Sequence, residues 1–164
     1  MEGGRSVKGS KLRLSEGDLE FPLESDLEKF ACGFAKVLRA PMVIWLEGDL
    51  GTGKTAFTRA LIHALGYEGK VKSPTYTLLE EYRPGSLQVL HMDLYRISDP
   101  GELEFLGLED MLDEQTILLI EWPDKGGCWL PEPDFMFRFA YASRGRDLHW
   151  TACTDAAREV DFPT

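Results

Sequence analysis

The chain has 164 residues, which is the length of one ordinary domain. Its composition, 43% hydrophobic and 11% aromatic, is sufficient for a packed core and excludes an intrinsically disordered chain. Eighteen basic against 28 acidic residues give a net charge of −10, which argues against unaided binding of DNA or RNA. The longest apolar runs, at 42–46 and 117–120, are too short to cross a membrane.

The start of the chain and its cysteines favour a cytoplasmic protein. Basic residues near the start are not followed by an apolar segment, so we expect no secretory signal. The three cysteines, Cys32, Cys128 and Cys153, are odd in number and widely spaced, which suits a reducing compartment. Their spacing does not match a metal site, and we expect no chemistry from them.

In chain order, residues 1–22 are rich in glycine, serine and charged residues without a sustained period, which predicts a flexible lead-in. Ser25–Glu28 then has the sequence of a capping box. Apolar residues recur after it at helical spacing, so we predict a helix to about Arg39. The apolar run 42–46, bounded by proline and glycine, predicts a strand buried on both faces.

A glycine-rich loop leads from this strand into a second amphipathic helix over residues 57–65, which ends at Gly66. Strand, loop and helix in this order form the first unit of an α/β sheet. The short turn at Arg83–Ser86 predicts an antiparallel hairpin, and helical turns fit between Gly101 and Leu112. Further strands are predicted at 76–82, 87–94, 117–121, 135–142 and 147–152.

The predicted fold class is therefore α/β, with a mixed sheet that has parallel strands around the glycine-rich loop and is flanked by helices. We predict a lead-in at 1–22, one globular domain at 23–152 and a C-terminal tail at 153–164.

The glycine-rich loop carries the most specific motif. Gly48–Thr55 reads GDLGTGKT and fits G-x-x-x-x-G-K-[ST] in full. Its glycines let successive backbone N–H groups approach phosphate oxygens, and the following helix N-terminus adds partial positive charge. Lys54 would reach the β- and γ-phosphates, and the Thr55 hydroxyl would bind Mg²⁺. We therefore predict a P-loop NTPase whose cofactor-binding candidates are Gly48, Asp49, Leu50, Gly51, Thr52, Gly53, Lys54, Thr55 and Ala56.

Two acidic residues are candidates for metal binding and catalysis. Glu121 ends the apolar run 117–120, as the acid of a Walker B strand does, and would lie beside the P-loop. In the strand after the predicted turn, the period of two puts His91, Asp93 and Tyr95 on one face. Such a polar face is unusual in a core strand and suits a metal and phosphates. The plainer alternatives are an acid at a surface strand end and a half-exposed edge strand.

Thr75 and Trp122 are further candidates. Thr75 lies in Ser73–Thr77, which a proline stiffens. If this segment is a switch loop, a hydroxyl here would contact the γ-phosphate or Mg²⁺ and so respond to hydrolysis; a plain turn is the equal alternative. Trp122 stands where the chain leaves the sheet, where it would line the nucleotide pocket, bind a partner or cover the core. We expect no chemistry from His63 and His149.

Several classes of P-loop protein do not fit. A GTPase reads guanine with N-K-x-D, and this chain contains no asparagine. A match to D-x-x-G at 124–127 has low specificity. A small-molecule kinase needs an arginine-rich lid, whereas Arg138, Arg144 and Arg146 lie in predicted strands and a hairpin. No arginine finger in cis is evident either. An AAA+ motor needs a helical lid domain, for which no room remains.

The order and spacing of four motifs resemble the bacterial TsaE (YjeE) family: GDLGTGKT at 48–55, SPTYTL at 73–78, HMDLYR at 91–96 and IEWP at 120–123. The resemblance covers about residues 25–150. That family is the ATPase component of the machinery that makes threonylcarbamoyladenosine at position 37 of tRNAs reading ANN codons. Tyr76 stands where the family commonly has phenylalanine, and Met92 where it commonly has an aromatic residue; neither change removes a polar group.

The resemblance implies that the P-loop holds the phosphates and Mg²⁺ of ATP, that either Asp93 or Glu121 orients the attacking water, and that the SPT segment is switch-like. The implied catalytic residues are Lys54, Thr75, Asp93 and Glu121, the implied metal ligands are Thr55, Asp93 and Glu121, and Trp122 joins the nucleotide-binding set.

The resemblance also implies partners. In that family, TsaD transfers the threonylcarbamoyl group to tRNA, and TsaE binds the TsaB–TsaD pair, which its ATP hydrolysis resets between turnovers. The tRNA would then be held through the partners, in agreement with the acidic charge of this chain. We expect slow hydrolysis by the isolated chain and stimulation by partners. The alternatives are a non-catalytic module gated by nucleotide and a small-molecule P-loop kinase.

Overall fold

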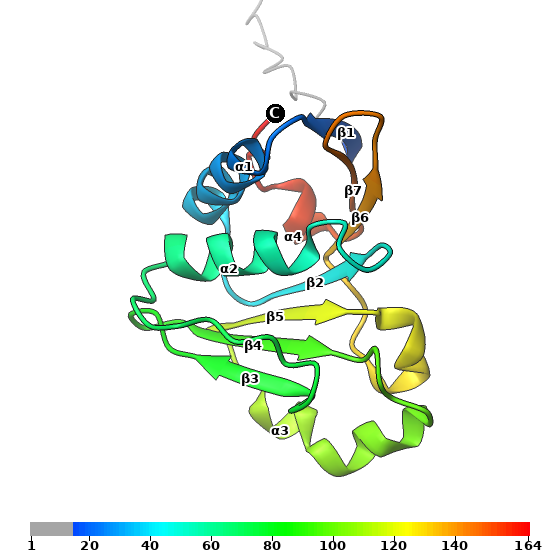
Figure 1. Cartoon of the computed structure of the whole chain (residues 1–164). Coiled ribbons are helices and arrows are strands. Elements are labelled where there is room, and N and C mark those ends of the chain that lie inside the picture. Colours follow the sequence, from blue (N-terminus) through cyan, green and yellow to red (C-terminus); the bar gives the residue numbers. More distant parts are fainter. Residues whose placement is uncertain (1–14) are drawn as a thin grey trace, which may run out of the picture.

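The computed structural model describes residues 15–164 of the chain. Within this range seven strands form one mixed sheet, in the spatial order β1-β7-β6-β2-β5-β4-β3 (Figure 1). The strands are β1 (Glu16–Phe21), β2 (Met42–Glu47), β3 (Leu79–Tyr82), β4 (Gln88–Asp93), β5 (Thr116–Glu121), β6 (Phe135–Tyr141) and β7 (Arg146–Ala152). The α-helices are α1 (Glu24–Val37), α2 (Lys54–Ala64), α3 (Leu108–Met111) and α4 (Asp155–Arg158), and the 3₁₀ turns are η1 (Pro100–Leu106), η2 (Pro123–Lys125) and η3 (Gly127–Trp129). None of the helices in residues 15–164 has the length and hydropathy needed to span a membrane.

Four parallel strands form the middle of the sheet. β2 pairs with β5 on one side and with β6 on the other, and β4 continues the parallel set beyond β5. β3 extends one edge of the sheet antiparallel to β4, and β7 and β1 extend the other edge in the same way. β4 and β5 are buried along their whole length, as expected for apolar parallel strands covered on both faces. The predicted fold class and the hairpin of β3 and β4 are thus confirmed.

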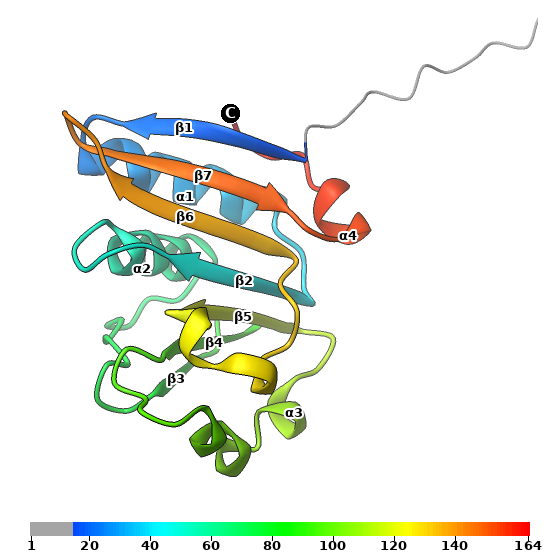
Figure 2. The same ribbon diagram turned by 90° about the vertical axis from the view of Figure 1, so that its right-hand side faces the viewer.

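The two faces of the sheet carry separate cores. Helices α1 and α2 cover one face, where the rings of Phe34 and Phe57 each lie 5.4 Å, centroid to centroid, from the ring of Phe137 on β6 (Figures 1 and 2). On the other face, η1 and α3 cover a smaller core that includes Leu90 of β4 and Ile120 of β5 (Figure 2). Because α2 is packed along its buried side, its N-terminus is held at the edge where the parallel strands end.

The predicted lead-in at 1–22 contains a strand. Residues 1–14 lie outside the described range, but β1 pairs with β7 at all six of its positions. Phe21 is 5% exposed, and its ring lies 5.4 Å from that of Phe30. The prediction of a flexible segment is therefore wrong for Glu16–Phe21. The pattern was missed because β1 is a short edge strand in which polar residues alternate with the few that face the core.

Helix α1 begins before its predicted cap. The N-cap is Leu23, whose N–H donates to the Asp26 carboxylate at 3.0 Å, so Ser25 lies inside the first turn. The predicted capping box at Ser25–Glu28 is wrong. The chain leaves β1 at Phe21, so the helix starts as soon as the backbone turns, and Asp26 satisfies the N–H of the cap residue.

The segment 153–164, predicted as a tail, packs on the domain. Thr154 caps the short helix α4 by accepting a hydrogen bond from the Ala157 N–H at 3.2 Å. Further on, the ring of Phe162 stacks on that of Trp150 with their centroids 3.9 Å apart. This aromatic contact ties the end of the chain to β7 and to the phenylalanine core beneath α1.

Candidate functional site

The loop between β2 and α2 has the backbone of a phosphate cradle. Gly48 and Gly53 have φ values of 138° and 114°, and a Cβ at Gly48 would lie 2.5 Å from the carbonyl oxygen of Phe139. The Thr52 hydroxyl donates to the Asp49 carbonyl at 2.7 Å, which holds the loop closed. Gly53 is the N-cap of α2 and supplies no capping side chain, so the first N–H groups of the helix keep their capacity to bind an anion.

Lys54 is the buried cation of this loop. The residue is 4% exposed, and its Nζ donates to the Gly48 carbonyl and lies 4.0 Å from the centre of the Trp122 ring. Burial lowers the pKa of Lys54, while the nearby carboxylates of Glu121 and Asp93 oppose part of that change. A buried ammonium is stable only when it is well paired. The phosphates of a nucleotide would be a stronger partner for Lys54 than the carbonyls of Gly48 and Asp49 and the Trp122 ring.

Two carboxylates stand side by side next to Lys54. Asp93 ends β4 and Glu121 ends β5, and the parallel register places the two residues directly opposite each other. They are 8% and 2% exposed, respectively. Glu121 Oε2 lies 2.9 Å from His91 Nε2, and Asp93 Oδ1 accepts from the Tyr95 N–H at 2.9 Å. The pairing of β4 with β5 thus brings the two predicted acids to one edge of the sheet.

Thr75 is connected to this pair of acids. Its hydroxyl donates to Asp93 Oδ2 at 3.1 Å, and Ser73 Oγ lies 2.7 Å from Thr75 Oγ1. The strand predicted from Tyr76 begins only at Leu79, because the preceding residues form a turn that ends with Leu78 at a φ of 69°. The Asp93 N–H donates to the Leu78 carbonyl at 3.1 Å, so both ends of this turn are attached to the acidic edge.

Trp122 lies between the site and the second core. Its backbone has a φ of 57°, which is uncommon for a residue with a side chain. Its ring contacts the Lys54 ammonium and lies 5.1 Å from the ring of Tyr95, and it also packs against the core beneath η1. Two of the roles considered for this residue, lining the pocket and covering the core, are therefore combined.

These residues surround a pocket of about 300 Å³, here called the P-loop pocket. Gly48 and Asp49 instead line an adjoining pocket of about 640 Å³, which shares Trp122 with the first. Thr52 is 1% exposed, and its hydroxyl is used in the hydrogen bond to the Asp49 carbonyl within the loop. The predicted site residues that line the P-loop pocket are Leu50, Gly51, Gly53, Lys54, Thr55, Ala56, Thr75, Asp93, Glu121 and Trp122.

Glu24 and Arg146 also line the P-loop pocket and were not among the predicted site residues. A Cβ at Gly53 would lie 2.5 Å from Arg146 Nη1, so the guanidinium lies directly against the loop. From the sequence, Arg146 was expected only in a late strand or hairpin, away from the loop. Strand pairing brings it to the loop, because Arg146 pairs with Phe21 of β1 and Tyr141 of β6 at the same edge. The basic residues of that hairpin were the only signal in the sequence.

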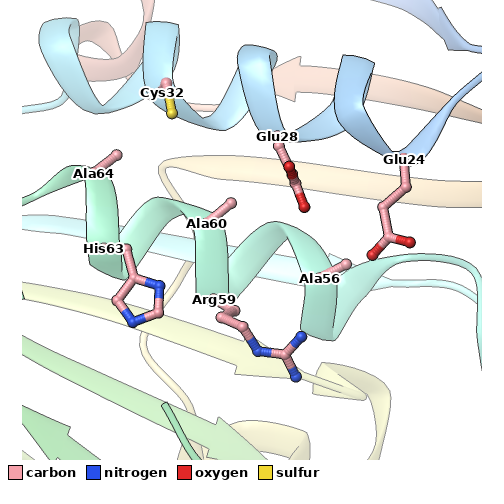
Figure 3. Close-up of a pocket in the computed structure, with 8 residues that line it drawn as sticks. All are labelled: Glu24, Glu28, Cys32, Ala56, Arg59, Ala60, His63 and Ala64. Atoms are coloured by element: carbon pink, nitrogen blue, oxygen red, sulfur yellow. The ribbon is translucent and has the colours of Figure 1, made fainter. Parts of the chain in front are cut away.

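The P-loop pocket adjoins a groove of about 440 Å³ between α1 and α2 (Figure 3). Glu24 and Ala56 line both spaces. Ala60 and Ala64 have small side chains that leave space on the α2 side of the groove, and Figure 3 shows their methyl groups directed toward α1. His63 contacts the Gly69 carbonyl at 2.9 Å through Nε2. The site is therefore open along the two helices as well as at the edge of the sheet.

The side chains available as metal ligands indicate which metal ion the site would hold. Among residues 15–164, no group of three or more His, Cys, Asp or Glu side chains is arranged to hold a metal ion. The candidate donors are the Thr55 hydroxyl and the carboxylates of Asp93 and Glu121. Mg²⁺ at a nucleotide site takes one or two carboxylates and completes its shell with phosphate oxygens and water. These residues fit a nucleotide-bound Mg²⁺ and do not fit a site made by protein alone.

The family of this chain follows from its match to known proteins. The model of the family described as "Threonylcarbamoyl adenosine biosynthesis protein TsaE" matches residues 21–148. The chain belongs to the TsaE family. The TsaE protein of Haemophilus influenzae is 40% identical over 144 residues, covering 85% of this chain and 91% of the relative. That of Bacillus subtilis is 44% identical over 96 residues, or 58% of each protein.

A solved structure supports the fold of the TsaE family for this chain. The crystal structure of YdiB from Bacillus subtilis superimposes with a TM-score of 0.67, at 28% sequence identity, and covers 87% of both chains. The matched region 21–148 includes the P-loop, both acids, Trp122 and Arg146. It also includes the whole of α1, but of β1 only the last residue, Phe21.

Proposed function

We propose that the chain is a Mg²⁺-dependent ATPase that acts in the formation of threonylcarbamoyladenosine on tRNA, together with TsaD and TsaB in the cytoplasm. Membership of the TsaE family supports the pathway. The main support for ATP hydrolysis is the arrangement of the P-loop pocket. There, a buried lysine at a helix N-terminus lies next to two acids on adjacent strand ends.

Each residue has a role in the proposed hydrolysis. The loop N–H groups and Lys54 would bind the phosphates and neutralise the charge that develops on them. Thr55 and the two acids would hold Mg²⁺, which when bound supplies further neutralisation of the β- and γ-phosphates. Asp93 or Glu121 would orient the attacking water, and Arg146 adds a cation beside Gly53. Water positioning and charge are the main needs of this reaction.

Partner control is supported by the turn that contains Thr75. One side of the turn bonds to Asp93, while the adjacent Tyr76 is 82% exposed and contacts the Arg96 guanidinium, 4.1 Å from its ring centre. Much of the Tyr76 side chain is therefore accessible to another protein. A partner that orders this turn would change the surroundings of Asp93 directly. We therefore expect slow hydrolysis by the isolated chain and faster hydrolysis in the complex with TsaB and TsaD.

The test is phosphate release from Mg-ATP by the chain alone and with the TsaB–TsaD pair and tRNA. We expect stimulation by the partners, and a loss of about 100-fold or more in Lys54→Ala and Glu121→Ala, the usual effect of removing a group that stabilises the transition state. Unchanged turnover in Lys54→Ala would refute catalysis at the P-loop. Binding of ATP without release in any mixture would favour a nucleotide-gated module, and a phosphorylated metabolite would favour a kinase.

A further inference from the structure

A buried histidine contacts Glu121 and has no role in the proposed reaction so far. His91 lies on β4, is 1% exposed, and has its Nε2 2.9 Å from Glu121 Oε2. The register pairs His91 with Leu119, so its ring reaches diagonally along the sheet to the acid at the end of β5. The two side chains share the face of the sheet that α2 covers, next to Lys54.

The hydrogen bond defines the orientation of the imidazole. A carboxylate oxygen is an acceptor, so Nε2 carries the hydrogen and donates it to Glu121. The second ring nitrogen, Nδ1, is buried without a hydrogen-bond partner within the described residues. In a strand core, such an unpaired polar atom lowers stability compared with an apolar side chain of similar size. Stability therefore does not account for a histidine here, and its single polar contact is Glu121.

We propose that His91 is a positioning residue for Glu121. Its Nε2–H holds Oε2 in one orientation and leaves Oε1, which accepts no hydrogen bond within residues 15–164, for the phosphate-bound Mg²⁺ or the attacking water. Without this bond, the carboxylate would rotate among several orientations beside Lys54. The inference rests on the proposed function and adds to it a residue that does not line the pocket.

The test compares His91→Leu, which removes the donor, with His91→Gln, whose amide nitrogen offers an N–H near the position of Nε2. Val89→Ala is the matched control, because Val89 is buried on the same face of β4 two residues earlier and does not touch Glu121. Calorimetry measures the affinity for ADP with Mg²⁺ and with EDTA, phosphate release measures turnover, and thermal unfolding monitors stability.

For His91→Leu, we expect ADP affinity in EDTA to stay at the wild-type value, because the P-loop is intact. The gain in affinity from Mg²⁺ and the turnover number should each fall about 10- to 100-fold, as for other residues that orient a metal ligand. His91→Gln should recover part of both losses. Val89→Ala should lower the melting temperature but keep the wild-type response to Mg²⁺.

Two results with the variants, and one with the wild type, would overturn the inference. One is a wild-type response to Mg²⁺ and wild-type turnover in His91→Leu; the other is an equal loss in His91→Leu and Val89→Ala, which would show a general effect of core damage. A wild-type protein that binds ADP equally with Mg²⁺ and with EDTA would refute the proposed metal site itself, and the role of His91 with it.

Discussion

At the scale of single residues, Lys54 shows a conflict between function and stability. Its ammonium is buried, and burial lowers its pKa below the ordinary 10.5 of the unfolded chain. Between that lowered pKa and 10.5, the unfolded state binds more protons than the folded state, so the free energy of unfolding rises with pH across this window. At pH values below the lowered pKa, Lys54 is charged in both states, and the folded protein bears the full free-energy cost of the buried charge.

Replacing this lysine should therefore stabilise the protein in the absence of nucleotide. We expect Lys54→Met to raise the free energy of unfolding at pH 7 by about 1 kcal/mol, the usual size of gains at functional positions. The advantage over the wild type should shrink as the pH approaches 10.5. Urea unfolding between pH 7 and pH 10 measures both effects. The control is Arg59→Met, which replaces an exposed residue on the same helix. A Lys54→Met variant that is less stable than the wild type at pH 7 would contradict this expectation.

At the scale of elements, short connections carry most of the site. The P-loop, the turn before β3, the turn at Trp122 and the start of β7 all lie where the parallel strands end or at the adjoining edge. Ligand sites in α/β sheets occur at this edge because strand ends and helix N-termini converge there. The edge strand β1 contributes indirectly, since its last residue, Phe21, pairs with Arg146.

This anchoring role of β1 can be tested with one substitution. Phe21→Ala removes a buried ring that contacts Phe30, and we expect it to lower the free energy of unfolding by about 3–5 kcal/mol. Glu20→Ala, at the neighbouring exposed position of the same strand, should change it by less than about 0.5 kcal/mol. Urea unfolding of both variants provides the comparison. If Phe21→Ala were as stable as Glu20→Ala, β1 would not be an integral part of the domain.

At the scale of the whole molecule, the negative charge is unevenly distributed. Between Asp99 and Glu114 the chain carries seven acidic residues and no lysine or arginine. These residues lie in and next to η1 and α3, on the face of the sheet opposite α1 and α2 (Figure 2). An acidic surface of this extent repels a phosphate backbone. The tRNA is therefore expected to be held by the partners.

The isolated chain should accordingly bind tRNA very weakly. We expect a dissociation constant above about 100 µM at 150 mM salt, which is weaker than ordinary non-specific binding by basic proteins. Fluorescence anisotropy with labelled tRNA measures it, and the TsaB–TsaD pair under the same conditions is the positive control. Micromolar binding by the chain alone would show that it contacts tRNA itself, despite its net charge of −10.

Local patterns were sufficient for the central part of the fold. The run 42–46, the loop 48–55 and the run 117–120 each specify their structure through nearby residues, and all three appear as predicted in β2, the P-loop and β5. The strands at both ends of the sheet were harder. β1 has a weak pattern because it is the edge strand of the sheet formed by residues 15–164, and its polar residues alternate with the few that face the core. The segment 153–164 is ordered by contacts with Trp150 rather than by its own periodicity.

By itself, the sequence determined the chemical types at the site: the glycines, Lys54 and Thr55 lie within eight residues, and two acids each end a strand. Only the tertiary structure decided which distant groups join them. The register of β4 with β5 sets Asp93 beside Glu121 and brings His91 to its carboxylate, and the register of β7 with β1 brings Arg146 to Gly53. Pairing between strands depends on how the whole sheet packs, and no local pattern of residues encodes it.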